Sequence, residues 1–313
     1  MANICFNWDI DNNFIFIKDL FPPIIEDNTE RVEHHINICI NNELEIRRIN
    51  DIVKSVPSIK TGFDGMYCGL FVSSYLNKSI IIITDIANNV TFAKIDPGYN
   101  HNTRILFLST LLRKHVFFHY VSKGYLVYHA SAILDRNTKK SIILLGSSGS
   151  GKTTFVMEAV KSGNYYFISD DRIVMNPNNK QIFGSPVVHL RSNAGNEYNY
   201  IIENKMLING GIKEKKHQAL IKECFYTNRA VCNCCIFLKQ YDNNTSSFLE
   251  KINNDECDDM FYNSQENLYS LFEKEKYQAA IKAIKSFEIF KLSHVERDKN
   301  FEVFLRGKNQ WGL

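Results

Sequence analysis

One glycine-rich segment constrains the fold more than any other part of the sequence. An apolar run, Ser141 to Leu145, leads into Gly146-Ser-Ser-Gly-Ser-Gly-Lys-Thr153, which matches G-x-x-x-x-G-K-[ST] at every position. The residues that follow, to about Ser162, have the amphipathic spacing of a helix, and Gly163 is a typical C-terminal cap. The sequence therefore predicts a buried strand, a phosphate-binding loop and a helix, in that order.

The residue types of this loop explain what it would bind. Small residues let main-chain N–H groups close around phosphate oxygens, and the positive end of the following helix faces the same phosphates. Lys152 is expected to reach the β- and γ-phosphates of ATP, and the Thr153 hydroxyl to hold Mg²⁺. The predicted nucleotide-binding residues are Gly146, Ser147, Ser148, Gly149, Ser150, Gly151, Lys152, Thr153 and Thr154. The alternative, a Gly/Ser turn that only caps a helix, is disfavoured by the complete match and its strand–helix context.

Two adjacent acids follow the next predicted strand. Asp170 and Asp171 come 18 and 19 residues after Lys152 (170 − 152 and 171 − 152), one helix and one strand further on. Neighbouring residues at a strand end point to different sides, so one acid can face a metal while the other faces an acceptor. A transporter-type ATPase is disfavoured, because the later apolar run Cys234 to Leu238 ends in a lysine and no LSGGQ-like segment occurs. A solvated Ser-Asp-Asp turn remains the alternative.

The order of the apolar runs divides the chain into two predicted parts. Residues 1–124 contain short β-branched and aromatic runs, followed by a helical rhythm over Thr103 to Ser122. Residues 125–313 alternate strands and helices, including a helix from about Gln265 to Ser286. The predicted fold class is therefore α/β, with a phosphate-loop core and a mixed sheet behind a smaller β-rich segment. The expected runs in the first part are Asn13 to Ile17, Ile36 to Ile40, Gly69 to Tyr75, Ser79 to Ile86 and Val90 to Ile95.

Composition excludes several classes of protein. The 37 basic and 34 acidic residues leave a net charge of only +3, too balanced for a nucleic-acid coat. The N-terminus has acids where a signal peptide has Lys or Arg, and no apolar stretch is long enough to span a membrane. The eight cysteines show no regular spacing, which disfavours a disulfide scaffold. These features predict a cytoplasmic protein with reduced thiols that binds neither nucleic acid nor membrane.

Taken together, these motifs resemble a known family. The segments are His129-Ala-Ser-Ala-Ile-Leu, the glycine-rich loop with its strand and helix, and Phe167-Ile-Ser-Asp-Asp171. They resemble the HPr kinase/phosphorylase group, which shares its nucleotide fold with phosphoenolpyruvate carboxykinase. The resemblance covers about residues 125–240. The chain resembles the shorter HPr-kinase-like proteins encoded near ribosomal-peptide biosynthesis genes more than it resembles the bifunctional enzyme.

The resemblance implies a role for several residues. Asp170 would be the catalytic acid/base that takes the proton of an acceptor serine, and Asp171 would join Thr153 in holding metal. His129 would match the family's active-site histidine, and Arg191 an arginine near the phosphates. A hydrogen-bonded core histidine and a surface arginine are the respective alternatives. The bifunctional enzyme has Glu-x-Arg where this chain has His189-Leu-Arg191, so a kinase without phosphorylase activity is expected.

The leading hypothesis is an ATP/Mg²⁺-dependent kinase that phosphorylates a serine or threonine hydroxyl of a protein or peptide, such as a ribosomal precursor peptide. Two alternatives stay open: a regulatory module that binds ATP without transferring phosphate, and a kinase of a small molecule such as free serine. A homo-oligomer also stays open. The acceptor is not readable, because specificity lies in loops and in the N-terminal segment.

Three further signals favour structure over chemistry. His115 and His119 are spaced like a metal pair on a helix, but the two phenylalanines between them suggest packing. Cys232, Cys234 and Cys235 lie in a strand-like run where adjacent residues face opposite ways, which suits packing better than one tetrahedral zinc. The run Lys213-Glu-Lys-Lys-His217 is expected to be a solvated loop, or else a mobile segment that closes over an acidic substrate.

Overall fold

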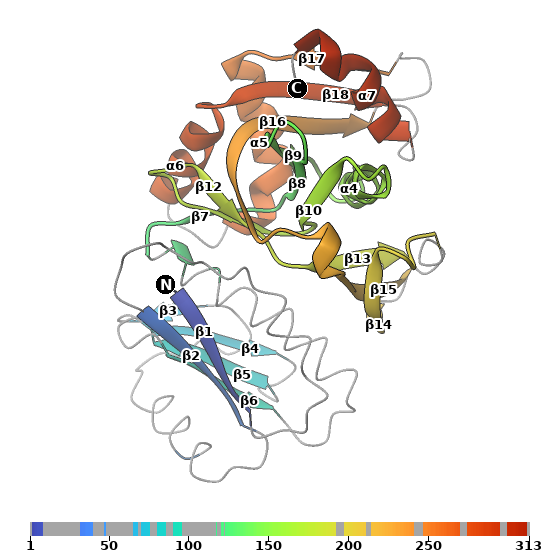
Figure 1. Ribbon diagram of the computed structural model, residues 1–313. Coiled ribbons are helices and arrows are strands. Elements are labelled where there is room, and N and C mark those ends of the chain that lie inside the picture. Colours follow the sequence, from blue (N-terminus) through green and yellow to red (C-terminus); the bar gives the residue numbers. More distant parts are fainter. Residues whose placement is uncertain are drawn as a thin grey trace. The chain divides into compact units, whose positions relative to one another are not determined.

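The structure is a computed structural model that forms two compact units, Met1–Lys123 and Gly124–Leu313. It describes residues 2–8, 32–39, 47, 65–67, 70–75, 80–85, 90–95, 117, 120–121, 123–191, 197–210, 214–240, 247–269, 274–294 and 299–311. Figure 1 shows the elements of both units. Each unit is described by itself.

The first unit contains a six-stranded sheet in the order β1-β2-β6-β5-β4-β3. The first two strands and β6 run parallel, and β3 to β6 form an antiparallel meander. The strands are β1 (Ala2–Trp8), β2 (Val32–Cys39), β3 (Gly65–Tyr67), β4 (Leu70–Tyr75), β5 (Ile80–Asp85) and β6 (Val90–Ile95). The predicted β-rich segment is confirmed, and Val90 to Ile95 matches at both ends. The expected strand Asn13 to Ile17 and most of the expected helix Thr103 to Ser122 lie outside the described residues.

The second unit is built on a nine-stranded mixed sheet. At its centre β9, β16 and β18 run parallel, while β8, β10, β12 and β17 are antiparallel to their neighbours. Its strands are β7 (Leu126–Tyr128), β8 (Ser131–Asp135), β9 (Ser141–Leu145), β10 (Tyr165–Ser169), β11 (Ile173–Met175), β12 (Gln181–Phe183), β16 (Arg229–Gln240), β17 (Phe248–Lys251) and β18 (Glu288–His294). The predicted α/β class with a mixed sheet is confirmed.

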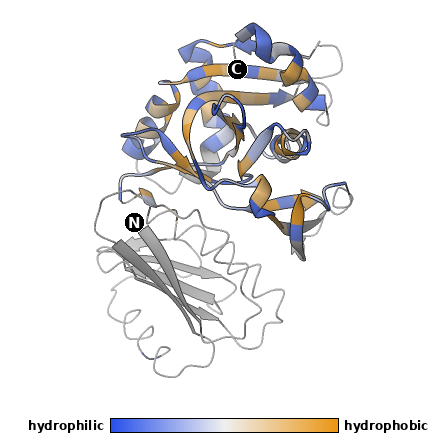
Figure 2. Cartoon of the chain, viewed as in Figure 1, coloured by the Kyte–Doolittle hydropathy of each residue, from blue (hydrophilic) through white to orange (hydrophobic). Residues whose placement is uncertain are grey.

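In the part of this unit that the structure describes, four helices lie against the sheet, two in each of its hydrophobic cores. They are α4 (Lys152–Lys161), α5 (Asn254–Tyr269), α6 (Lys274–Ile284) and α7 (Asn300–Trp311). Alternate residues of β9 serve the two cores: Ile142 and Leu144 pack in the core of α4 and α7, whereas Ile143 and Leu145 pack in the core of α5 and α6. Figure 2 shows hydrophobic residues running along β16 and β18. None of the helices in the described part of the chain has the length and apolar character needed to cross a membrane.

A separate three-stranded antiparallel sheet has the order β13-β15-β14, with β13 (Val187–Arg191), β14 (Ile202–Gly210) and β15 (Glu214–Ile221). The expected loop Lys213 to His217 is therefore wrong for residues 214–217, which form the start of β15. The run looks like a loop because its residues are polar. Pairing with a strand on each side provides the main-chain hydrogen bonds that hold it extended. The short 3-10 helix η2 (Glu223–Phe225) follows.

The single helix expected from Gln265 to Ser286 is also wrong. Two helices, α5 and α6, occupy this part of the chain, and α5 begins eleven residues earlier than expected, at Asn254 (265 − 254). Asp255 and Glu256 lie in its first turn, where carboxylates favour a helix N-terminus, and the Asn253 side chain accepts a hydrogen bond from the Glu256 N–H at 2.9 Å. Both helices bury apolar residues in the same core, and no glycine or proline between Gln265 and Ser286 signals a break in the sequence.

Candidate active site

The phosphate loop lies between β9 and α4, as the motif predicts. Gly149 and Gly151 have φ angles of 81° and 92°, in the left-handed region that favours glycine. Gly146 is required by space: a Cβ there would lie 2.6 Å from the Ser150 Oγ and 2.8 Å from the main-chain oxygen of Leu238. The loop is thus closed tightly over its own backbone at the carboxyl end of a buried parallel strand.

Lys152 folds back over this loop. Its Nζ donates hydrogen bonds to the main-chain oxygens of Gly146, at 2.7 Å, and Ser147, at 3.1 Å. The side chain is buried, and this burial lowers the pKa of Lys152 to about 8, although the nearby Asp170 and Asp171 raise it. With a pKa near 8, Lys152 is still charged at neutral pH, so it is suited to bind phosphate oxygens.

Thr153 and Asp170 are joined by a short hydrogen bond. The Thr153 Oγ1 donates to the Asp170 Oδ1 at 2.6 Å, and the Asp170 side chain is only 2% exposed. The main-chain N–H of His189 donates to the other carboxylate oxygen at 2.9 Å. The Ser131 hydroxyl donates to the main-chain oxygen of Asp170 and lies 3.4 Å from its Oδ1. Residues from α4, β8 and β13 therefore fix Asp170 in one orientation.

Asp171 has different partners from Asp170. Its Oδ1 lies 3.5 Å from the His129 Nε2 and 3.1 Å from Nη1 of Arg172. Burial, followed by the charge of Arg172, lowers the pKa of His129 from 6.5 to about 4, although Asp171 acts in the opposite direction. His129 is thus neutral at physiological pH. The side chains of His129 and Asp171 are 26% and 27% exposed, so this pair is open to solvent while Asp170 is not.

His189 lies on the other side of Asp170. Its Nδ1 is 3.6 Å from the Asp170 Oδ2, and its Nε2 is 2.9 Å from the Nε2 of Gln218, its cross-strand neighbour on β15. Arg191 is the last residue of β13 and pairs with Lys216, but its side chain lies outside the part of the chain that the structure describes.

Several residues near the site carry no recognisable signal in the sequence. Ser131 holds Asp170, and Arg172 holds Asp171. Asn300, at the start of α7, donates from Nδ2 to the main-chain oxygen of Ser150 at 3.3 Å, and Gln265 on α5 contacts the main chain of His129. Only Arg172, directly after the two acids, could have been suspected from its place in the chain.

The residues present fit ATP with Mg²⁺. The loop turns so tightly at Gly146 that no Cβ fits there, and Lys152 supplies a cation beside it. Thr153 and the two acids supply the hard oxygen ligands that Mg²⁺ prefers. No group of three or more His, Cys, Asp and Glu side chains arranged for a metal occurs among the residues the structure describes. That is compatible with Mg²⁺, which is commonly bound through one or two protein ligands together with substrate phosphates.

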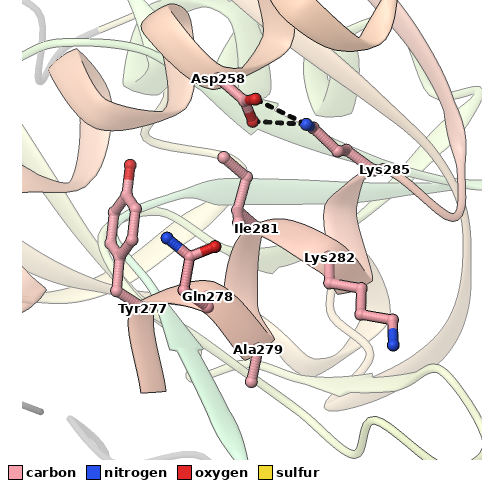
Figure 3. Close-up of a pocket in the computed structure, with 7 residues that line it drawn as sticks. All are labelled: Asp258, Tyr277, Gln278, Ala279, Ile281, Lys282 and Lys285. Carbon is pink, nitrogen blue, oxygen red and sulfur yellow. Dashed lines mark hydrogen bonds and ion pairs between the residues drawn. The ribbon is translucent and has the colours of Figure 1, made fainter. Parts of the chain in front are cut away.

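Two cavities lie elsewhere in the second unit. One of about 600 Å³ is lined by residues of α6, by Asp258 of α5 and by Lys285, and Figure 3 shows the ion pair between Asp258 and Lys285 among these lining residues. The other, of about 140 Å³, is lined by Asp135, Lys140, Ile142, Asn233, Cys234 and Glu288. None of the described residues that line them belongs to the phosphate loop, so neither cavity is the nucleotide site.

The other signals are structural or untested. Cys234 packs in the core of α4 and Cys235 in that of α5, so these adjacent residues do face opposite sides of the sheet. Burial raises the pKa of the thiols of Cys234, Cys235 and Cys257, which makes them poor nucleophiles. His115 and His119 lie outside the described residues.

No protein-family model and no curated protein sequence matches the chain. Among solved structures, it matches the Hpr(Ser) kinase/phosphatase from Coxiella burnetii, with 11% sequence identity and a TM-score of 0.30. The match covers 59% of this chain and 95% of that one. At this level of similarity, function has to be inferred from the residues of the site itself.

Proposed function

We propose that the protein is an ATP/Mg²⁺-dependent kinase that transfers the γ-phosphoryl group to a serine or threonine hydroxyl of a protein or peptide. The observation that carries the proposal is the hydrogen bond between Thr153 and Asp170 beside the phosphate loop, with a second acid, Asp171, next to a neutral histidine. One acid is thereby tied to the metal-binding hydroxyl, while the other is accessible. Phosphoryl transfer needs this division, because it depends on positioning and charge neutralisation with one carboxylate to orient the acceptor.

The contacts favour the reverse of the roles that the family resemblance implies for the two acids. Asp170 is buried and bonded to Thr153, which suits it to the metal side of the site. Asp171 is partly exposed and lies beside His129, which suits it to the acceptor side. We assign Asp171 as the group that accepts the proton of the acceptor hydroxyl, with His129 as its neutral neighbour.

The proposed reaction then uses the following groups. The acceptor oxygen forms a bond to the γ-phosphorus while the bond from that phosphorus to the β–γ bridging oxygen breaks, and the acceptor proton passes to Asp171. Lys152 and the loop N–H groups hold the phosphates, and Thr153 with Asp170 would hold Mg²⁺. Bound Mg²⁺ would neutralise phosphate charge. Arg172 keeps Asp171 in place through its hydrogen bonds to the Asp171 side chain and main chain.

The finer assignments follow the sequence resemblance. We propose a kinase of the HPr-kinase-like group, nearest to the forms linked to ribosomal-peptide biosynthesis, with Arg191 near the phosphates. His189 stands where the bifunctional enzyme has a glutamate, and it lies against Asp170. We therefore expect no phosphorylase activity. The first unit would recognise the acceptor, the cytoplasm would be its location, and a homo-oligomer is compatible with the proposal.

The test is transfer of label from γ-labelled ATP to candidate peptides, to proteins and to free serine, with mass spectrometry of the products. Wild-type protein should label a peptide or protein acceptor, and Lys152→Ala, Asp170→Asn and Asp171→Asn should each abolish transfer. Lys161→Ala, an exposed lysine on the same helix as Lys152, and Asp259→Asn, an exposed acid on α5, are the matched controls.

The outcomes separate the possible functions. Nucleotide binding that depends on Lys152, without product from any acceptor, would identify an ATP-binding regulatory module instead. Phosphoserine formed only from the free amino acid would identify a small-molecule kinase. Undiminished transfer by Asp171→Asn would overturn the base assignment while leaving the kinase proposal intact.

A further inference from the structure

The main chain of His129 is held by one buried side chain from a distant helix. His129 lies between β7 and β8, where the chain passes from one strand to the next. Its N–H donates to the Oε1 of Gln265 at 2.7 Å, and its carbonyl oxygen accepts from the Gln265 Nε2 at 3.0 Å. One amide therefore pairs with both main-chain groups of His129, as a neighbouring strand would, across 136 residues of sequence.

The chemistry of this contact fixes which way the amide points. A main-chain N–H can only donate and a carbonyl can only accept, so the oxygen of Gln265 must face the first and its nitrogen the second. The second amide hydrogen is directed to the Ser264 Oγ at 3.2 Å, and that hydroxyl donates to the Phe261 carbonyl at 2.9 Å. Gln265 is only 1% exposed, and its amide nitrogen thus has partners for both hydrogens.

The helix that carries Gln265, α5, is itself anchored to β7, the strand that directly precedes His129. Phe261, one turn earlier on α5, packs edge-on against the ring of Tyr128, with centroids 6.1 Å apart. Tyr128 directly precedes His129, and its hydroxyl donates to the Ala280 carbonyl of α6 at 3.0 Å. Asp258 on α5 pairs with Lys285, just after α6, at 2.6 Å (Figure 3). The position of Gln265 along His129 is therefore set by the contacts of α5 with Tyr128 and with Lys285.

We propose that Gln265 is a positioning residue, which fixes the main chain of His129 so that its imidazole lies beside Asp171. The inference rests on the proposed function for its kinetic consequence, although the positioning itself does not. Both hydrogen bonds of the Gln265 amide are to the main chain of His129, so they form whether or not the imidazole is protonated. Without the amide, two partly buried main-chain groups would lose their partners, and the segment would shift toward solvent or another partner.

Two variants test the positioning directly. Gln265→Leu removes both bonds, and Gln265→Glu keeps the size and the acceptor but loses the donor to the His129 carbonyl. Gln278→Leu, an exposed glutamine on α6, is the matched control. Hydrogen exchange of the His129 amide should accelerate about tenfold or more in Gln265→Leu, while the amide of Ile133 in β8 keeps its protection. The imidazole NMR signals of His129 should move in both variants and stay unchanged in the control.

Kinetic measurements on the same variants distinguish a loss of His129 positioning from a general loss of stability. In both variants kcat should fall by about tenfold or more, with the KM for ATP within about twofold of wild type, because the phosphate loop is untouched. On a His129→Ala background, Gln265→Leu should cause no further loss of kcat.

Unchanged exchange and imidazole signals in Gln265→Leu would overturn the proposal. An imidazole that moves while kcat does not would confirm that Gln265 positions His129 and overturn the kinetic consequence, since the position of the imidazole would then be irrelevant to the reaction. If the wild-type protein transfers phosphate to no acceptor, the proposed function fails, and the exchange and imidazole results alone decide whether Gln265 positions His129.

Discussion

The hydroxyl of Thr153 donates a 2.6 Å hydrogen bond to the carboxylate of Asp170, 17 residues further along the chain. This bond connects the first turn of α4 with the residue that follows β10, so the phosphate loop and the first acid form one unit. It predicts that loss of the Thr153 hydroxyl affects both the stability of the fold and the binding of metal.

Thr153→Val should destabilise the protein by about 1–3 kcal/mol, because the buried carboxylate of Asp170 loses a short hydrogen bond. The Mg²⁺ dependence of ATP binding should weaken in the same variant. Thr153→Ser keeps the hydroxyl and should keep both properties. Urea unfolding and titration calorimetry with and without Mg²⁺ provide the measurements, and a Thr153→Val protein as stable as wild type would contradict the importance of the bond.

Gly146→Ala should abolish nucleotide binding, since its Cβ would press against the Leu238 carbonyl and Ser150. The strain should cost roughly 1–3 kcal/mol of stability as well. Gly163→Ala is the matched control: its φ of 80° is unfavourable for alanine, but a Cβ there meets open space and lies beyond the far end of α4. Differential scanning fluorimetry with added ATP should show both variants destabilised and only Gly163→Ala responding to nucleotide.

ATP affinity should fall as the pH rises above about 8. Lys152 has a lowered pKa of about 8 in the free protein, so it is protonated below that pH and loses its charge above it. Binding of an anion to the charged form must then take up a proton at high pH, and Kd should rise toward tenfold per pH unit. Calorimetry from pH 7 to 9.5 measures the effect. Lys152→Met should bind weakly with little change over this range, and an equally steep curve for that variant would assign the titration to another group.

Stability should decrease as the pH falls from 6.5 toward 4 because of His129. The folded-state pKa of His129, about 4, lies below its ordinary value of 6.5, so the unfolded chain binds the extra proton in that window. The contribution of neutral His129 to the free energy of unfolding is therefore fully present above pH 6.5 and is lost as the pH approaches 4. Between pH 7.5 and 5 it amounts to about 2 kcal/mol. Urea unfolding at both pH values should show a smaller pH effect for His129→Asn than for wild type.

The parts of the fold that could be predicted are those where several local signals agree. The strand, loop and helix around Lys152 combine an apolar run, a motif and a capping glycine, and the structure places α4 within a residue of its expected ends. The boundary between α5 and α6 could not be predicted, because both helices bury apolar residues in one core and no glycine or proline separates them in the sequence. The charged half of β15 has the composition of a loop, because a strand made of polar residues is set by its neighbours rather than by its own composition.

In the candidate site, too, some residues could be predicted from the sequence and others could not. Lys152, Thr153 and Asp170 are in direct or near contact, and motif spacing alone pointed to all three. Gln265 and Ser131 could not be found in this way, because each acts through a bond to the main chain of a residue far along the sequence. Such a bond requires only a polar side chain at the right point in space, and it leaves no periodic pattern.

The alternating side chains of β9 tie the two hydrophobic cores of the second unit to one strand. Ile142 and Leu144 belong to one hydrophobic core, and Ile143 and Leu145 belong to the other, so neither core can come apart without disturbing this strand. The phosphate loop begins at the residue after Leu145. Its shape should therefore persist until the whole second unit unfolds cooperatively, and substitutions that loosen only the outer strands or helix ends should reduce the melting temperature without altering ATP affinity.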